Sequence, residues 1–127
     1  MALYVGGCFC GAVRIAIDAE PLRIGICHCL DCRKRQGAIF HSFAVFPAKA
    51  VTITGETRQY QTRSFCPVCG SPLFDRFGEE FELHAGCLDD IDRLRPGYES
   101  WTIRREAWLP PFDLPDHFER DRIPAAK

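Results

Sequence analysis

The sequence has no excess of charge of either sign. Its 127 residues include 16 basic and 17 acidic side chains, which gives a formal net charge of -1. Proteins that bind nucleic acid or an anionic membrane surface usually present a strongly basic face, so this balance argues against a polyanion as partner. No apolar run approaches the roughly 20 residues of a membrane-spanning helix. We therefore expect neither a nucleic-acid partner nor a membrane partner.

We expect no export signal, because residues 1–7 contain neither a basic stretch nor a long apolar one. We therefore expect a cytoplasmic protein. Internal repeats and low-complexity tracts are absent, and hydrophobic residues make up 46% of the chain. This composition is typical of a globular protein, and the length is close to that of one common domain. We expect residues 1–127 to form a single domain.

The hydrophobic pattern predicts a mainly β protein. Apolar and polar side chains alternate over residues 13–17, which is the period of a half-buried strand. Further strands are expected at residues 22–27, 39–46, 51–54, 58–65, 73–77 and 81–85. Two hairpins are expected, one joining 51–54 to 58–65 and one joining 73–77 to 81–85. The one expected helix covers residues 30–36. The proline-rich tail, 110–127, should run extended over the surface or fray, because prolines exclude regular ladders.

Eight cysteines are the unusual feature of the composition. Disulfides are disfavoured in a reducing cytosol, and grouped cysteine spacings suit metal chelation, although a disulfide framework stays open as an alternative. Cys8 and Cys10 precede a glycine, and so do Cys66 and Cys69 in the knuckle-like segment Cys-Pro-Val-Cys-Gly. Four thiolates make a closed, structural zinc site. The alternative is four buried apolar cysteines.

A second group contains Cys27, Cys29 and Cys32, with no fourth cysteine at matching spacing. Three protein ligands leave one coordination position open, which is typical of a zinc ion that meets substrate or water. Two other interpretations remain. Another side chain could close the site, or Cys29 and Cys32 could form a redox pair. The side chains that could close it are His28, His41, His84 and Cys87.

The order of these motifs resembles that of the GFA family, the glutathione-dependent formaldehyde-activating enzymes and the related centromere protein V domain. The matching motifs are Cys-x-Cys-Gly at 8–11, Cys-His-Cys-x-x-Cys-Arg at 27–33, Gly-Ala at 37–38, Cys-x-x-Cys-Gly at 66–70 and Ala-Gly-x-Leu-Asp at 85–89. The resemblance covers about residues 5–110. It implies a β-tent fold of antiparallel sheets stapled by zinc. It also implies two zinc ions per chain, a structural one on Cys8, Cys10, Cys66 and Cys69 and a functional one on Cys27, Cys29 and Cys32.

The resemblance further implies a carbon-sulfur lyase similar to S-(hydroxymethyl)glutathione synthase. Such an enzyme adds a small thiol, glutathione or a similar one, to formaldehyde or another small aldehyde. Zinc held by three thiolates is a weak Lewis acid, which disfavours hydrolysis. It can still hold a substrate thiol as the thiolate that attacks an aldehyde. The predicted catalytic residues are therefore Cys27, Cys29 and Cys32 as zinc ligands. The competing hypothesis is a non-catalytic zinc-binding protein-interaction module.

One segment departs from the family pattern. The family has Pro-x-x-His-Ile before a tryptophan, whereas this chain keeps Pro96 and Trp101 and has Glu99 in place of the histidine. We predict substrate contacts by Arg33, Glu99 and Trp101. Arg33 begins a basic run that could receive a substrate carboxylate, although a solvated turn is the alternative. Cys87 lies outside the seven-cysteine pattern, and we predict that it is a small buried hydrophobe.

Overall fold

The computed structural model describes residues 2–123 of the chain. The strands are β1 (Tyr4–Gly7), β2 (Arg14–Ile17), β3 (Arg23–Cys27), β4 (His41–Pro47), β5 (Val51–Thr54), β6 (Arg58–Tyr60), β7 (Arg63–Phe65), β8 (Pro72–Phe77), β9 (Glu80–His84), β10 (Tyr98–Ser100) and β11 (Asp116–His117). The α-helix is α1 (Leu30–Gln36), and short 3-10 turns cover Ala48–Ala50, Ala85–Cys87 and Thr102–Arg104. Among the described residues, no helix is long and apolar enough to cross a membrane.

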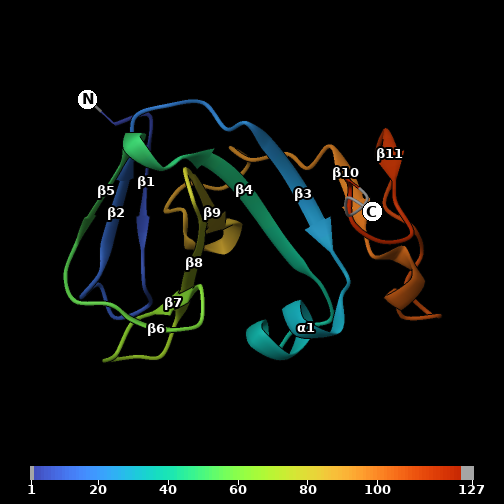
Figure 1. Ribbon diagram of the computed structural model, residues 1–127, viewed down its shortest axis with the longest axis horizontal. Helices are drawn as coiled ribbons and strands as arrows, with labels where there is room; N and C mark the ends of the chain where they lie inside the picture. Colours follow the sequence, from blue (N-terminus) through green and yellow to red (C-terminus); the bar gives the residue numbers. More distant parts are fainter. Residues whose placement is uncertain (1, 124–127) are drawn as a thin grey trace.

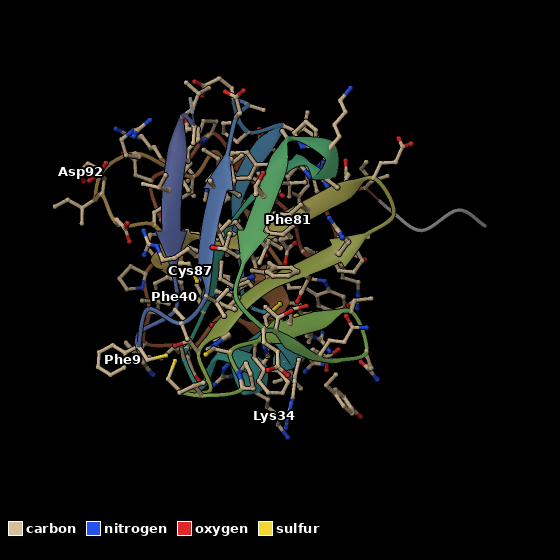
Figure 2. The ribbon with its side chains drawn as sticks, turned by 90° about the vertical axis from the view of Figure 1, so that its left-hand side faces the viewer. Phe9, Lys34, Phe40, Phe81, Cys87 and Asp92 are labelled. Atoms are coloured by element: carbon tan, nitrogen blue, oxygen red, sulfur yellow. The ribbon has the colours of Figure 1, made fainter. Side chains whose placement is uncertain are left out.

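Strands β1, β2 and β5 form a small antiparallel sheet with β2 in the centre. Figure 1 shows this sheet at one side of the larger one. Tyr4, Ile15 and Ile17 are at most 5% exposed, because every second residue of these strands faces the larger sheet. They pack there against Phe46, Phe81 and other apolar side chains to form the main hydrophobic core. Figure 2 shows Phe81 inside the body of the molecule.

The larger sheet has the strand order β11-β10-β3-β4-β9-β8-β7-β6. Its two faces differ in chemistry because side chains alternate along each strand. Ala44 and Phe46 of β4 belong to the main core, whereas Phe43 and Val45 form a second apolar cluster with Cys27 and Tyr98. The face that carries this second cluster also carries Glu82 and His84 of β9 and Asp75 of β8. The expected mainly β architecture is confirmed.

The expected helix at residues 30–36 and the hairpin of β8 with β9 are both confirmed. The other expected hairpin is wrong. Strand β5 pairs with β2, so that Ile53 lies opposite Ile15 and both reach the core. Residues 58–65 instead fold on themselves as the hairpin of β6 and β7. Gln61 permits the reversal by adopting a left-handed φ of 56°.

The last strands were not predicted, and they include parallel pairs. Strand β10 pairs in parallel with both β3 and β11, so the larger sheet is mixed rather than purely antiparallel. The expectation that the tail makes no ladder is wrong at Asp116–His117, because Pro115 precedes this strand instead of interrupting it. The N–H of Phe118 donates to the carbonyl of Glu99 at 2.8 Å, which fixes the tail to the sheet edge. Residues 124–127 lie outside the described part of the chain.

Candidate metal centres

Four cysteines that were predicted to share a metal ion come together from two loops. Cys8 and Cys10 lie between β1 and β2, and Cys66 and Cys69 lie between β7 and β8. The Sγ atoms of Cys8 and Cys10 are 3.6 Å apart, and those of Cys10 and Cys66 are 3.8 Å apart. Thiolates at about 2.3 Å from a tetrahedral zinc ion are about 3.8 Å from one another. The spacing of the sulfurs therefore fits a zinc ion.

The loops that present these sulfurs depend on two glycines. Gly11 and Gly70, each following a cysteine pair, have φ values of 83° and 77°. Residues with a Cβ atom rarely adopt such positive φ values. At the second loop, the Ser71 hydroxyl lies 3.1 Å from Sγ of Cys69. Its hydrogen bond lowers the pKa of Cys69 to about 5. Cys69 is therefore a thiolate at neutral pH, the form that binds a metal ion.

Cys27, Cys29 and Cys32 converge where β3 leads into α1. Cys27 ends the strand, and Cys29 is the N-cap of the helix, its Sγ accepting a hydrogen bond from the N–H of Cys32 at 3.3 Å. The three Sγ atoms all lie within 4.8 Å of one another. Within residues 2–123, no further His, Cys, Asp or Glu joins this group. The group can offer a metal ion three sulfur ligands.

Charge is shared unequally among these three thiols. Hydrogen bonds from Cys27 and Cys32 lower the pKa of Cys29 to about 2. The same interactions raise the pKa of Cys27 to about 11 and also raise the pKa of Cys32. One thiolate is thus held by two neutral thiols. A divalent cation bound here would displace the two remaining protons.

A cavity of about 350 Å³ opens beside the second cysteine group. Phe43, Tyr98 and Trp101 provide aromatic walls. The cavity also has charged side chains of both signs, namely Arg23, Arg63, Arg122, Asp75, Glu82 and Asp121. Sulfur ligands, aromatic walls and a few charged groups together suit a small polar molecule.

The predicted substrate contacts lie in different places. Trp101 lines this cavity. Arg33 lies on α1 and forms an ion pair with Glu106 at 2.5 Å, outside the cavity. Glu99 is completely buried behind the cavity wall and does not line it. The structure therefore brings Trp101, but not Arg33 or Glu99, to the cysteines.

Glu99 instead joins several cationic or hydrogen-bonding groups around one carboxylate. His28 Nε2 and His117 Nδ1 each lie 2.7 Å from a Glu99 oxygen, Arg105 donates at 3.2 Å, and the N–H of Phe112 donates at 3.1 Å. Burial raises the pKa of Glu99, but the hydrogen bonds from His28, Arg105 and His117 outweigh it and leave the pKa lowered. We call Glu99, His28, Arg105 and His117 the Glu99 cluster. It ties the tail to the segment between Cys27 and Cys29.

Acid should weaken the Glu99 cluster. The pKa of Glu99 is 4.5 in its unperturbed state and lower in the folded protein. Its contribution to stability is therefore fully present above about pH 4.5 and is lost as the pH falls through the lower folded value. Urea denaturation of wild type and Glu99→Gln measures this contribution, because effects of acid on the cysteine sites are common to both. We expect the difference in unfolding free energy to shrink below about pH 4.5. A constant difference down to about pH 3 would contradict this assignment.

Cys87 is only partly buried, and it packs against the main hydrophobic core. It ends the 3-10 turn that follows β9. Its thiol donates to the carbonyl of Pro72 at 3.4 Å, and burial raises its pKa to about 12. The thiol is therefore neutral under ordinary conditions and is a poor nucleophile.

A further cluster of possible metal ligands was not predicted as a group. His41, Glu82 and His84 each place one ligand atom within 4.8 Å of the others. From the sequence, each of the two histidines is only a separate candidate to close the second cysteine group. They lie on paired strands far apart in the sequence. One signal in the sequence could have identified this face: polar residues occupy alternate positions of β9, and the residues between them are apolar and belong to the core.

Comparison with known proteins agrees with the sequence motifs and with the fold. The family model described as glutathione-dependent formaldehyde-activating enzyme, GFA, matches residues 3–104. The crystal structure of a Rhodobacter sphaeroides protein has a similar fold, with a TM-score of 0.54 and 24% sequence identity, over 70% of this chain and 91% of that chain. The match to the family model extends over most of the chain and includes all seven motif cysteines. This chain therefore belongs to the GFA family.

Proposed function

We propose that this protein is a zinc-dependent carbon-sulfur lyase that adds a thiol such as glutathione to formaldehyde or another small aldehyde. The observation that carries the proposal is the group of Cys27, Cys29 and Cys32. It offers three sulfur ligands beside a cavity, and no fourth protein ligand joins it among residues 2–123. Membership of the GFA family supports the same reaction class.

Zinc would be held at both cysteine groups, which gives two ions per chain. Cys8, Cys10, Cys66 and Cys69 would surround a structural ion, because four clustered thiolates can complete the tetrahedral coordination of zinc. Cys27, Cys29 and Cys32 would hold the functional ion. Zinc at that place supplies a position where an incoming thiol is held as a thiolate.

The cavity residues would orient the two reactants. In the reaction, the thiol sulfur forms a bond to the aldehyde carbon, and the C=O π electrons move to the oxygen, which takes up the thiol proton. Arg63 and Arg122 lie in the cavity wall and can receive a carboxylate of the thiol substrate. Trp101 provides a flat apolar wall beside the sulfurs. Contact with Arg33 or Glu99 would first require breaking the ion pair with Glu106 or opening the Glu99 cluster.

The test measures both binding and turnover. Calorimetry should detect glutathione binding, and S-methylglutathione should bind more than about 10-fold more weakly because a thioether is a much poorer zinc ligand than a thiolate. Exchange NMR should show faster formation of S-hydroxymethylglutathione from glutathione and formaldehyde than occurs without the protein. Cys29→Ser should lower that acceleration by more than about 100-fold. Cys87→Ser is the matched control and should retain it.

A folded, zinc-loaded protein that neither binds small thiols nor accelerates the reaction would overturn the proposal. The alternative, a non-catalytic zinc-binding protein-interaction module, would then be favoured. One observation supports that alternative. Phe9, between the first two cysteines, is 95% exposed, and Val68, between the other two, is 74% exposed. Figure 2 shows Phe9 pointing away from the body of the protein.

A further inference from the structure

His41, Glu82 and His84 gather on the face of the larger sheet that also carries Cys27. His41 comes from β4, while Glu82 and His84 occupy alternate positions of β9 and so point to the same side. The side chains of His41, Glu82 and His84 are only 4%, 19% and 6% exposed. Two imidazoles and a carboxylate are thus largely removed from water. Buried polar groups of this kind need hydrogen-bonding or metal partners.

The spacing of these groups suits ligands of one ion better than it suits a hydrogen bond. His41 Nε2 and Glu82 Oε2 are 3.5 Å apart, which is long for a hydrogen bond. Nitrogen and oxygen ligands at about 2.1 Å from a tetrahedral zinc ion lie about 3.4 Å from each other. A ligand atom of His84 also lies within 4.8 Å of both. The three ligand atoms are therefore close enough for one cation to draw them together.

Gln36 of α1 holds both histidine rings from the opposite side. Its side-chain amide nitrogen lies 3.1 Å from Nδ1 of His41 and 2.7 Å from Nδ1 of His84. Rotating the side-chain amide of Gln36 by half a turn would exchange its nitrogen and oxygen. The oxygen could then accept a hydrogen bond from the N–H at Nδ1 of each ring. Both Nε2 atoms would then carry a lone pair; that of His84 lies 3.8 Å from Oδ1 of Asp75, so binding an ion would turn it from that carboxylate toward the ion. A hydrogen bond from the second ring nitrogen is what orients histidines that bind metals.

We propose that His41, Glu82 and His84 form a further metal site, which takes a divalent first-row transition ion through two imidazole nitrogens and one carboxylate oxygen. This donor set contains no sulfur, so it differs in kind from both cysteine groups. His41 and Glu82 line the same cavity as Cys27, Cys29 and Cys32. An ion here would share that cavity with whatever binds at the cysteines. The inference does not depend on the carbon-sulfur lyase activity.

The experiment adds cobalt(II) to the full-length protein after its cysteine sites have been filled with zinc. We expect one further equivalent of cobalt to bind, with visible d–d bands and without the near-ultraviolet charge-transfer band of cobalt bound to thiolate. His84→Ala and Glu82→Gln should each weaken this binding by more than about 100-fold, while the zinc content and the circular dichroism spectrum stay unchanged. Glu79→Gln is the control and should bind cobalt as wild type does, because Glu79 is exposed and belongs to none of the three ligand groups.

Two results would overturn the site. One is cobalt that enters only with the thiolate charge-transfer band, since this shows exchange at the cysteines. The other is cobalt binding that survives in folded Glu82→Gln and His84→Ala. Gln36 gives an independent check, because Gln36→Leu removes the group that orients both rings and should weaken cobalt binding by about 10- to 100-fold. Gln36→Glu keeps an acceptor and should retain binding. Equal affinity in Gln36→Leu and wild type would contradict the arrangement.

Discussion

Replacing Cys66 by serine is expected to leave no soluble, folded protein. Cys66 is completely buried, and its Sγ lies 3.8 Å from that of Cys10 in the four-cysteine group. A structural zinc ion contributes on the order of 10 kcal/mol of folding free energy, which is comparable to the entire net stability of a domain. The group also joins the loop after β1 to the turn before β8. Losing one ligand should therefore separate two halves of the fold.

Soluble yield, circular dichroism and metal content measure this effect. Cys87→Ser is the control, because Cys87 is partly buried but belongs to neither cysteine group. Cys29→Ser is the informative comparison. It should remain folded and lose or weaken only one metal ion, because Cys27, Cys29 and Cys32 lie beside a single strand end and one short helix. If Cys29→Ser unfolds as completely as Cys66→Ser, the second group is structural too. A folded Cys66→Ser protein without zinc would contradict the role of the first group.

The cysteine groups could be found from the sequence because most of their geometry is local. Cys-x-Cys and Cys-x-x-Cys bring two sulfurs to one turn whatever the rest of the chain does, and Gly11 and Gly70 mark the turns that need a left-handed residue. Short strands were also predictable, because alternation over residues 13–17 reflects one buried face. The pairing of the strands was harder to predict from the sequence. Nothing within residues 51–65 indicates that β5 pairs with β2 in the small sheet.

Sites assembled from distant strands were the part that the sequence could not reveal. Glu99 is predicted to contact substrate because it occupies a family position, but the sequence does not indicate that Arg105 and His117 bind its carboxylate. The same reasoning applies to His41, which meets Glu82 and His84 only through the pairing of β4 with β9. For His41 and for the contact of Glu99 with His117, the chemistry follows from strand pairing rather than from any spacing along the chain.

The second large effect is expected at Glu99. Replacing it by alanine would leave His28 completely buried and Arg105 largely buried, each without the carboxylate that accepts its hydrogen bond. Removing one partner of a buried ion pair typically costs about 3–5 kcal/mol, because the remaining charge stays out of water. We expect the free energy of unfolding of Glu99→Ala to fall by about this amount. Urea denaturation of the zinc-loaded protein measures it.

A control variant and a double variant test whether the loss of stability comes from the unpaired buried charge rather than from substitution of any glutamate. Glu79→Ala removes an exposed carboxylate and should change the free energy of unfolding by less than about 0.5 kcal/mol. Arg105→Leu combined with Glu99→Ala should recover part of the loss, because the unpaired guanidinium is then gone as well. Strict additivity of the two single variants would show that Glu99 and Arg105 do not interact. Coupling between them would instead show that Arg105 and this buried carboxylate stabilise the fold as a pair; the same carboxylate also holds His28, between Cys27 and Cys29.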